Sequence, residues 1–210
     1  MKYIGLYYIF LLIIDKLLVK KANWFVLHAI TNFIIAVCVF EDMAKLFLDP
    51  YYSRNEVITF PRDITISLHI YHLLMFKKVE MIDWIHHIVM CSVLSISYYV
   101  ENSTTIAHYL LFFVTGLPGG IDYILLILVK YGKINSMTEK ELNSLINIWI
   151  RSPGIIVGTY IINLQCNKNI MVVEYWIKIL VIISFIWNAQ YFTKRVVQNY
   201  GYVKGKTYIE

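Results

Sequence analysis

The chain consists of long apolar runs separated by short polar segments. A helix needs about 20 mostly apolar residues to cross the hydrocarbon core of a membrane. Candidate spans lie at residues 3–19, 24–41, 63–77, 82–100, 104–131, 147–165 and 170–193. The pattern predicts an all-α fold, a polytopic transmembrane helical bundle of about six to seven spans. No repeat or linker divides it, so residues 1–210 are expected to form a single transmembrane domain.

Composition supports this interpretation. Apolar residues make up 59% of the chain and charged residues only 16%, whereas soluble domains carry about a quarter charged residues. The net charge is +5, but the basic residues lie between the apolar runs rather than on one face. This placement predicts membrane topology and no nucleic-acid partner. The oligomeric state is left open.

The orientation follows from the lysines and arginines in the short connections. They are concentrated after the first, third and fifth candidate spans and after the last one, as in the lysine pairs at 20–21 and 77–78. Cytoplasmic loops carry an excess of these residues. We therefore expect a multi-pass integral membrane protein with a cytosolic C-terminus.

The fifth segment contains the sequence GLPGG at 116–120. Pro118 cannot donate a backbone hydrogen bond, and the glycines permit unusual dihedral angles. The sequence predicts that this segment is broken there and lines a central cavity, with a simple proline kink as the alternative. Residues 137–151 are expected to form an amphipathic helix along the membrane surface, or the solvated start of the sixth span.

All six histidines lie in or beside the predicted spans. Ionisable side chains are costly at membrane depth, so they usually face the bundle interior and mark a functional site. The sequences HIYH and DWIHH contain four of them, and the full set is His28, His69, His72, His86, His87 and His108. Histidine is also the most common general base at neutral pH.

In DWIHH, Asp83 lies three and four residues before His86 and His87, so its carboxylate can orient an imidazole one helical turn away. Capping of the helix start is the alternative role for Asp83. Neighbouring residues on a helix point about 100° apart. We therefore expect one histidine of the pair to face the cavity and the other to support it.

Two further ionisable residues could contribute to this site. Asp122 follows the GLPGG sequence directly, and Arg151 lies near the cytosolic end of a span, where it could pair with Asp122 or a lipid phosphate. A zinc site made from two or three histidines is left open, but no spacing requires one. The membrane di-iron enzymes have a third histidine box, which is absent here, so no metal ligand is assigned.

The sequences HIYHLL, DWIHHIVM and GGIDYILLILVKYG resemble motifs of the TLC-domain family, which includes the ceramide synthases. The resemblance covers residues 63–132 and matches the family's histidine pair to His86 and His87 and its later acid to Asp122. It implies helices arranged around a lipid-accepting cavity. Ceramide synthases carry a second acid three residues before the later one, where this chain has Gly119.

Together these features predict a multi-pass membrane protein with a lipid-accepting cavity, and whether it is an enzyme is left open. The first hypothesis is a lipid acyltransferase that uses a buried histidine pair, and the resemblance implies N- or O-acyl transfer like that of the ceramide synthases. His86, His87, Asp83 and Asp122 are the candidate catalytic residues, and His69, His72, His108 and Arg151 are expected to bind substrate. A membrane lipid is the expected partner and acyl-CoA the expected co-substrate, with no cofactor assigned. The endoplasmic reticulum or another endomembrane is the expected location. A non-catalytic lipid-binding or lipid-regulating protein, and a transporter or channel, are the alternatives.

Overall fold

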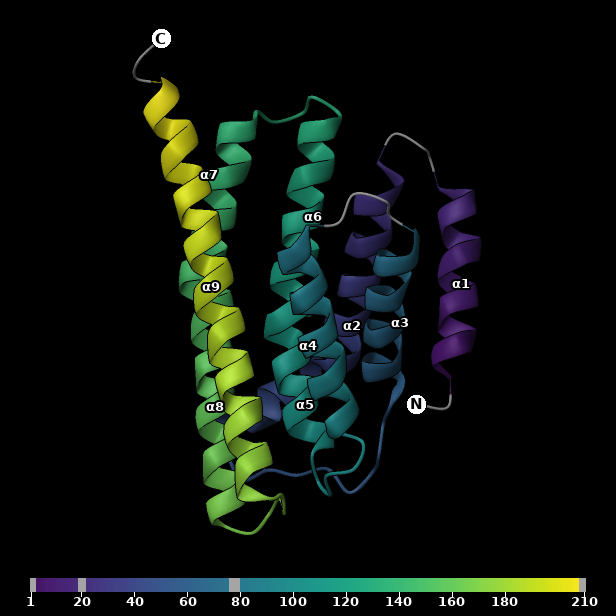
Figure 1. The fold of residues 1–210 in the computed structure, drawn as a ribbon, viewed down its shortest axis with the longest axis vertical. Helices are drawn as coiled ribbons and strands as arrows, with labels where there is room; N and C mark the ends of the chain where they lie inside the picture. Colours follow the sequence, from purple (N-terminus) through teal and green to yellow (C-terminus); the bar gives the residue numbers. More distant parts are fainter. Residues whose placement is uncertain (1–2, 19–21, 76–79, 208–210) are drawn as a thin grey trace.

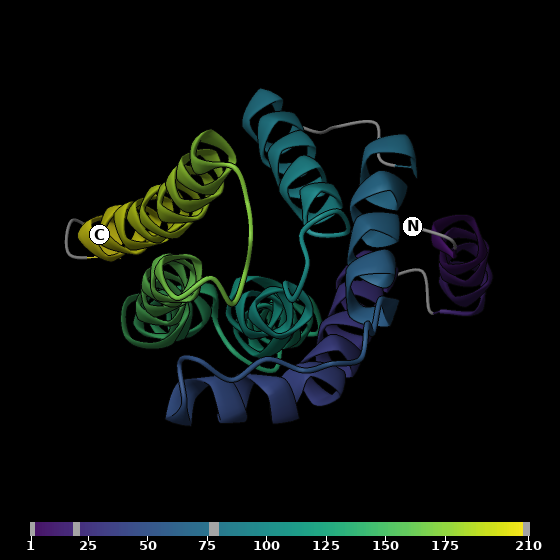
Figure 2. The same cartoon turned by 90° about the horizontal axis from the view of Figure 1, so that it is seen from below.

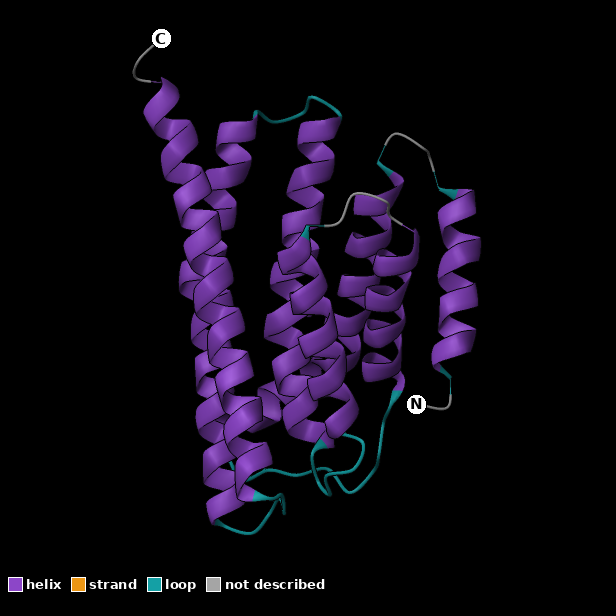
Figure 3. Cartoon of the chain, viewed as in Figure 1, coloured by secondary structure: helices purple, strands orange, loops and turns teal. Residues whose placement is uncertain are grey.

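The protein is a bundle of helices. A computed structural model of the chain describes residues 3–18, 22–75 and 80–207, and these contain helices and loops but no strand (Figures 1 and 3). The lysine pairs at 20–21 and 77–78 lie outside the described residues. The predicted all-α class is confirmed.

The helices follow the predicted apolar segments. Their bounds are α1 (Ile4–Leu17), α2 (Asn23–Leu48), α3 (Phe60–Met75), α4 (Met81–Ile96), α5 (Thr104–Leu111), α6 (Leu117–Lys130), α7 (Ser136–Ile146), α8 (Ser152–Asn167) and α9 (Tyr175–Thr207). Within the described residues, four continuous helices are long and apolar enough to cross a membrane, at 23–48, 104–130, 136–167 and 175–206. The predicted count of six to seven spans is not confirmed, because α4 is apolar but short.

The fifth segment is continuous, so the break expected at GLPGG does not occur. Helix α5 passes through a π-helical turn, η1 (Phe112–Gly116), directly into α6. Pro118 lies in the first turn of α6. The wide π turn accommodates the proline without interrupting the helix. This result also removes the discontinuous helix on which the transporter hypothesis depended.

The expected surface helix is also different in the structure. Asn135 caps the start of α7, because its side-chain oxygen accepts a hydrogen bond from the backbone N–H of Thr138 at 2.7 Å. Helix α7 then continues through a second π-helical turn, η2 (Asn147–Arg151), into α8. Residues 136–167 thus form one long helix along the bundle (Figure 1), not a helix lying on a surface.

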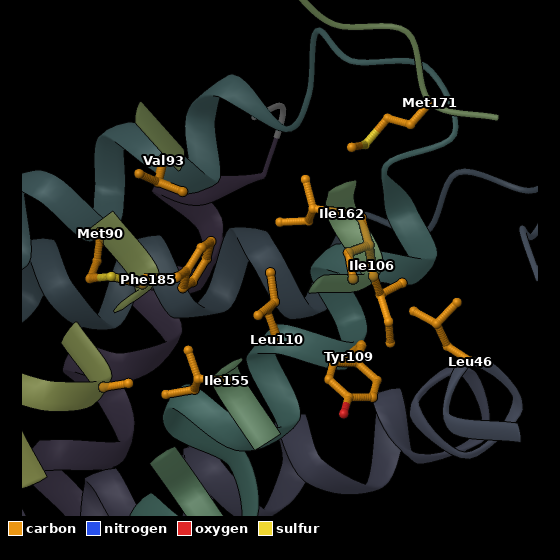
Figure 4. Close-up of a cluster of buried hydrophobic side chains, with 12 residues drawn as sticks. Leu46, Met90, Val93, Ile106, Tyr109, Leu110, Ile155, Ile162, Met171 and Phe185 are labelled. Carbon is orange, nitrogen blue, oxygen red and sulfur yellow. The ribbon is translucent and has the colours of Figure 1, made fainter. Parts of the chain in front are cut away.

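Seen from the end, the helices form a ring with α1 outside it (Figure 2). The chain of contacts runs from α3 to α4, α9, α8, α5, α2 and back to α3, and α1 packs mainly against α3. A large apolar cluster joins α4, α5, α8 and α9, and includes Met90, Leu110, Ile155 and Phe185 (Figure 4). The inner face of the ring is where the polar side chains gather.

Candidate functional site

A polar cavity of about 230 Å³ lies inside the ring. A water molecule occupies about 30 Å³ in the liquid, so this volume holds several waters or a small polar group. Its wall is built from α2, α3, α4, α5, α6, α7, α9 and the two π turns. The polar lining residues are His28, Asn32, Thr65, His69, His72, His86, His87, Thr115, Asp122, Tyr123, Asn143, Asn147 and Arg151.

The histidine rings are packed against one another around His87. The centroid of the His87 ring lies 4.8 Å from that of His69, 4.6 Å from that of His72 and 5.3 Å from that of His86. His86 and His87 both line the cavity. We expected only one of the pair to do so. Helix α4 is a member of the ring between α3 and α9, and two side chains about 100° apart on it both reach the enclosed space.

Several buried polar atoms in the cavity have no hydrogen-bond partner within the described part of the chain. They are both ring nitrogens of His87, Oδ1 of Asp122 and Nη1 of Arg151. His87 and Arg151 are each only 9% exposed. Burying a polar group without a hydrogen bond costs roughly 1–3 kcal/mol. A group of such atoms facing one space is therefore suited to contacts with a bound polar molecule.

Two of the histidines have a fixed orientation. Nδ1 of His69 lies 2.8 Å from the carbonyl oxygen of Thr65, and Nδ1 of His28 lies 3.2 Å from the carbonyl oxygen of Trp24. Each carbonyl belongs to the residue one turn earlier in the same helix. Since a carbonyl only accepts, Nδ1 must carry the proton in both rings. Their Nε2 atoms then hold a free lone pair.

Arg151 reaches the cavity because of the proline in the neighbouring helix. Pro118 has no N–H to give to the carbonyl of Val114, four residues before it. Nε of Arg151 donates to that carbonyl at 3.3 Å. Nη2 of the same guanidinium donates to Oδ1 of Asn188 at 2.5 Å. The GLPGG sequence therefore anchors an arginine, rather than opening a gap in the helix.

Gly119 of α6 faces the side chain of Asn32 on α2. A Cβ atom at this position would lie 2.8 Å from Nδ2 of Asn32. Asn32 is held in place because its Oδ1 accepts a hydrogen bond from the Thr115 hydroxyl at 2.9 Å. The position at which ceramide synthases carry a second acid thus has no room for a side chain unless Asn32 moves.

Asp83 does not orient an imidazole in this structure. It is absent from the cavity lining, and its Oδ1 lies 3.6 Å from Nη1 of Arg195 in a partly exposed ion pair. Within the described residues, the side chain at hydrogen-bonding distance from the His86 ring is Asn188, whose Nδ2 lies 3.0 Å from Nδ1 of the ring. Asp83 lies in the first turn of α4, and its ion-pair partner is Arg195 of α9.

His108 belongs to a different polar cluster. Its Nδ1 lies 2.6 Å from Oδ2 of Asp42, and its Nε2 lies 3.2 Å from the carbonyl oxygen of Ile58. Arg54, in the loop between α2 and α3, donates to the same aspartate at 2.9 Å. The hydrogen bond with Asp42 raises the pKa of Arg54 above its ordinary value. This cluster ties the loop to the bundle, so His108 is separated from the substrate site predicted for it.

Six of the eight candidate residues line one cavity, and the roles expected of them stay predictions. The cavity contains His69, His72, His86, His87, Asp122 and Arg151, and not Asp83 or His108. Sequence reasoning missed Asn32, Thr115, Tyr123, Asn143 and Asn147 as lining residues. Asn32 could have been found, because it lies four residues after His28 in an apolar run. The others needed the tertiary structure.

A second, almost wholly apolar cavity of about 60 Å³ adjoins the polar one. The two share Met90, Leu94, Leu111 and Val114 as lining residues. The apolar cavity lies among the side chains of α4, α5, α8 and α9, several of which appear in Figure 4. Helix α4 runs along both, from His86 and His87 in the polar cavity to Ile96 in the apolar one.

Comparison with known proteins gives no match for this chain among protein-family models, curated proteins or solved structures.

Proposed function

We propose that this integral membrane protein accepts an amphipathic lipid and transfers an acyl group at its histidine cavity. The observation that carries the proposal is His87. Both of its ring nitrogens are buried and without a hydrogen-bond partner within the described residues, in a cavity that adjoins an apolar one. This arrangement suits a ligand with a polar end and an apolar chain.

The two cavities hold different parts of the lipid. Its polar end occupies the histidine cavity, beside Asp122 and Arg151, and its chain follows α4 into the apolar cavity. His86 and His87, in the first turns of α4, line the polar cavity. The start of α4 is its upper end in Figure 1, on the same side of the bundle as the C-terminus of the chain. With the C-terminus in the cytosol, as the loop charges predict, the lipid enters from the cytosolic leaflet of an endomembrane.

The proposed reaction transfers an acyl group from a thioester such as acyl-CoA to a lipid hydroxyl or amine. A histidine of the His86–His87 pair takes the proton of the nucleophile, whose oxygen or nitrogen bonds to the acyl carbon. The carbon–sulfur bond breaks, and the thiolate that leaves takes up a proton. A buried site with little water favours this transfer over hydrolysis.

Purified protein in lipid nanodiscs should convert long-chain acyl-CoA and a long-chain base or a lysophospholipid into an acylated product, measured by mass spectrometry. General-base catalysis contributes about 10²–10⁴-fold. The substitution His87→Gln should therefore lower kcat by at least about 100-fold. Ser92→Ala, on the exposed side of the same helix, is the matched control. Absence of turnover with every acceptor, or full activity of a His86→Ala/His87→Ala variant, would overturn the proposal.

A second candidate function, non-catalytic lipid binding, is favoured by Gly119. The side chain of Asn32 fills the place where ceramide synthases have their second acid. A protein that only holds or presents a lipid needs the paired cavities but no proton transfer. Lipid that co-purifies with the chain and is retained equally by His86→Ala/His87→Ala, in the absence of turnover, supports this function instead.

A further inference from the structure

The side chain of Asn188 connects a permanent cation to one histidine of the cavity. It is completely buried in α9. Its Oδ1 lies 2.5 Å from Nη2 of Arg151, and its Nδ2 lies 3.0 Å from Nδ1 of His86. A guanidinium has donors and no acceptor. The amide oxygen must therefore face Arg151, and the amide nitrogen must face His86.

This orientation decides where the proton of His86 resides. The amide NH₂ of Asn188 can only donate, so Nδ1 of His86 must accept with its lone pair. A neutral imidazole carries its one proton on the other nitrogen, here Nε2. His69 is the reverse, because its Nδ1 donates to the Thr65 carbonyl and its Nε2 holds the lone pair. At Nε2, His86 thus offers an N–H donor, whereas His69 offers a lone pair that accepts.

We propose that Arg151 and Asn188 are positioning residues that hold His86 as a hydrogen-bond donor to the substrate and leave His87 as the proton acceptor. The inference rests on the proposed acyl transfer, and it assigns a different role in that reaction to each of the two adjacent histidines. Nε2–H of His86 donates to the acyl carbonyl oxygen as negative charge develops on it, the role of an oxyanion-hole donor. His87, whose ring nitrogens have no hydrogen-bond partner within the described residues, takes the proton of the nucleophile.

The same hydrogen bonds bear on metal binding. One ring nitrogen from each of His69, His86 and His87 lies within 4.8 Å of the others, a grouping that resembles a zinc site. A histidine that binds zinc gives a lone pair to the metal and donates its other N–H to an acceptor. His86 has the opposite arrangement, because Asn188 donates to it. The native triad therefore offers the cavity an N–H where a zinc site needs a lone pair.

The substitution Asn188→Asp tests this assignment. It replaces the amide NH₂ group that donates to His86 with a carboxylate oxygen that can only accept, and it keeps the shape of the side chain. A carboxylate accepts from Arg151 with one oxygen and from Nδ1–H of His86 with the other, so it should move the His86 proton from Nε2 to Nδ1. Nitrogen NMR of ¹⁵N-histidine-labelled protein distinguishes protonated from unprotonated ring nitrogens, and His86→Gln identifies the signals. Asn163→Asp is the matched control, since Asn163 also pairs with a cation, Lys178, at 3.3 Å.

In the native protein we expect His86 to be protonated at Nε2, and in Asn188→Asp at Nδ1. The variant should lose about 100-fold or more in kcat with little change in KM, as expected when a catalytic imidazole holds the wrong tautomer. It should also bind Zn²⁺ at least about 10-fold more tightly than the native protein, by calorimetry. Asn163→Asp should change none of these.

A native His86 protonated at Nδ1 would overturn the inference, as would a tautomer that Asn188→Asp leaves unchanged. Full kcat in a variant whose tautomer is reversed would overturn the donor role of His86. The NMR and zinc measurements need no substrate. If they come out as expected while no acyl acceptor is turned over, the proposed reaction fails and the Arg151–Asn188–His86 arrangement stands.

Discussion

The close approach at Gly119 allows a quantitative prediction about the wall of the histidine cavity. In Gly119→Ala the new Cβ meets Nδ2 of Asn32 at 2.8 Å, which is shorter than van der Waals contact. Overpacking a well-packed position costs roughly 1–3 kcal/mol. Rotation of Asn32 also breaks its hydrogen bond with Thr115, worth about 1 kcal/mol. Alanine recovers about 0.5–1 kcal/mol through its better helix propensity.

The net loss is about 2 kcal/mol. A change of 1 kcal/mol moves the melting temperature of a chain of this size by about 2–4 °C. Thermal unfolding in detergent, followed by tryptophan fluorescence, should therefore show a decrease of roughly 4–8 °C. Gly201→Ala in α9 is the control, because nothing lies within 4 Å of its added Cβ. Its melting temperature should stay the same or rise. If Gly119→Ala behaves like Gly201→Ala, Asn32 is not held against α6 and the described cavity wall is wrong.

Three other predictions follow from the contacts. Asp42→Ala leaves a buried donor on His108 and a partly exposed donor on Arg54 without their shared acceptor, and should cost about 1–3 kcal/mol of unfolding free energy by the same thermal assay. A loss under about 1 kcal/mol would show that the loop is held by other contacts. Val93→Phe fills the apolar cavity and should shift acyl-CoA preference towards shorter chains in a competition assay, and an unchanged preference would place the chain elsewhere. Asp83→Ala removes only a partly exposed ion pair and should change the unfolding free energy by less than about 1 kcal/mol; a larger loss would mean that Asp83 has a buried partner.

The local features of the helices could be predicted from the sequence because they depend on near neighbours in the chain. The apolar runs located the described helices other than α7, which the amphipathic pattern at 137–151 predicted, and the proline and glycines at 116–120 marked the position of an irregularity. Its form could not be predicted. A break and a π turn satisfy the same local constraints, and the choice depends on which group donates a hydrogen bond to the Val114 carbonyl, which the N–H-lacking Pro118 leaves unpaired. Arg151, 33 positions later, supplies that group.

For the histidine cluster too, the sequence predicted some features, and others depended on the tertiary structure. Ionisable groups in apolar segments must turn away from lipid, so the sequence alone placed His69, His72, His86 and His87 in the bundle interior. It also favoured Asp83 as the partner of an imidazole, since helical spacing is the only proximity that a sequence displays. The structure brings Asn188 to His86 from more than 100 positions away and turns Asp83 towards Arg195.

The sequence by itself therefore determined that this chain is a helical membrane bundle with a histidine-rich interior, because the hydrophobic effect and helical periodicity act over short stretches. Only the tertiary structure decided which side chains meet across helices. Those contacts make one polar cavity beside an apolar one, seat Asn188 between Arg151 and His86, and so determine which ring nitrogen can give a proton and which can take one.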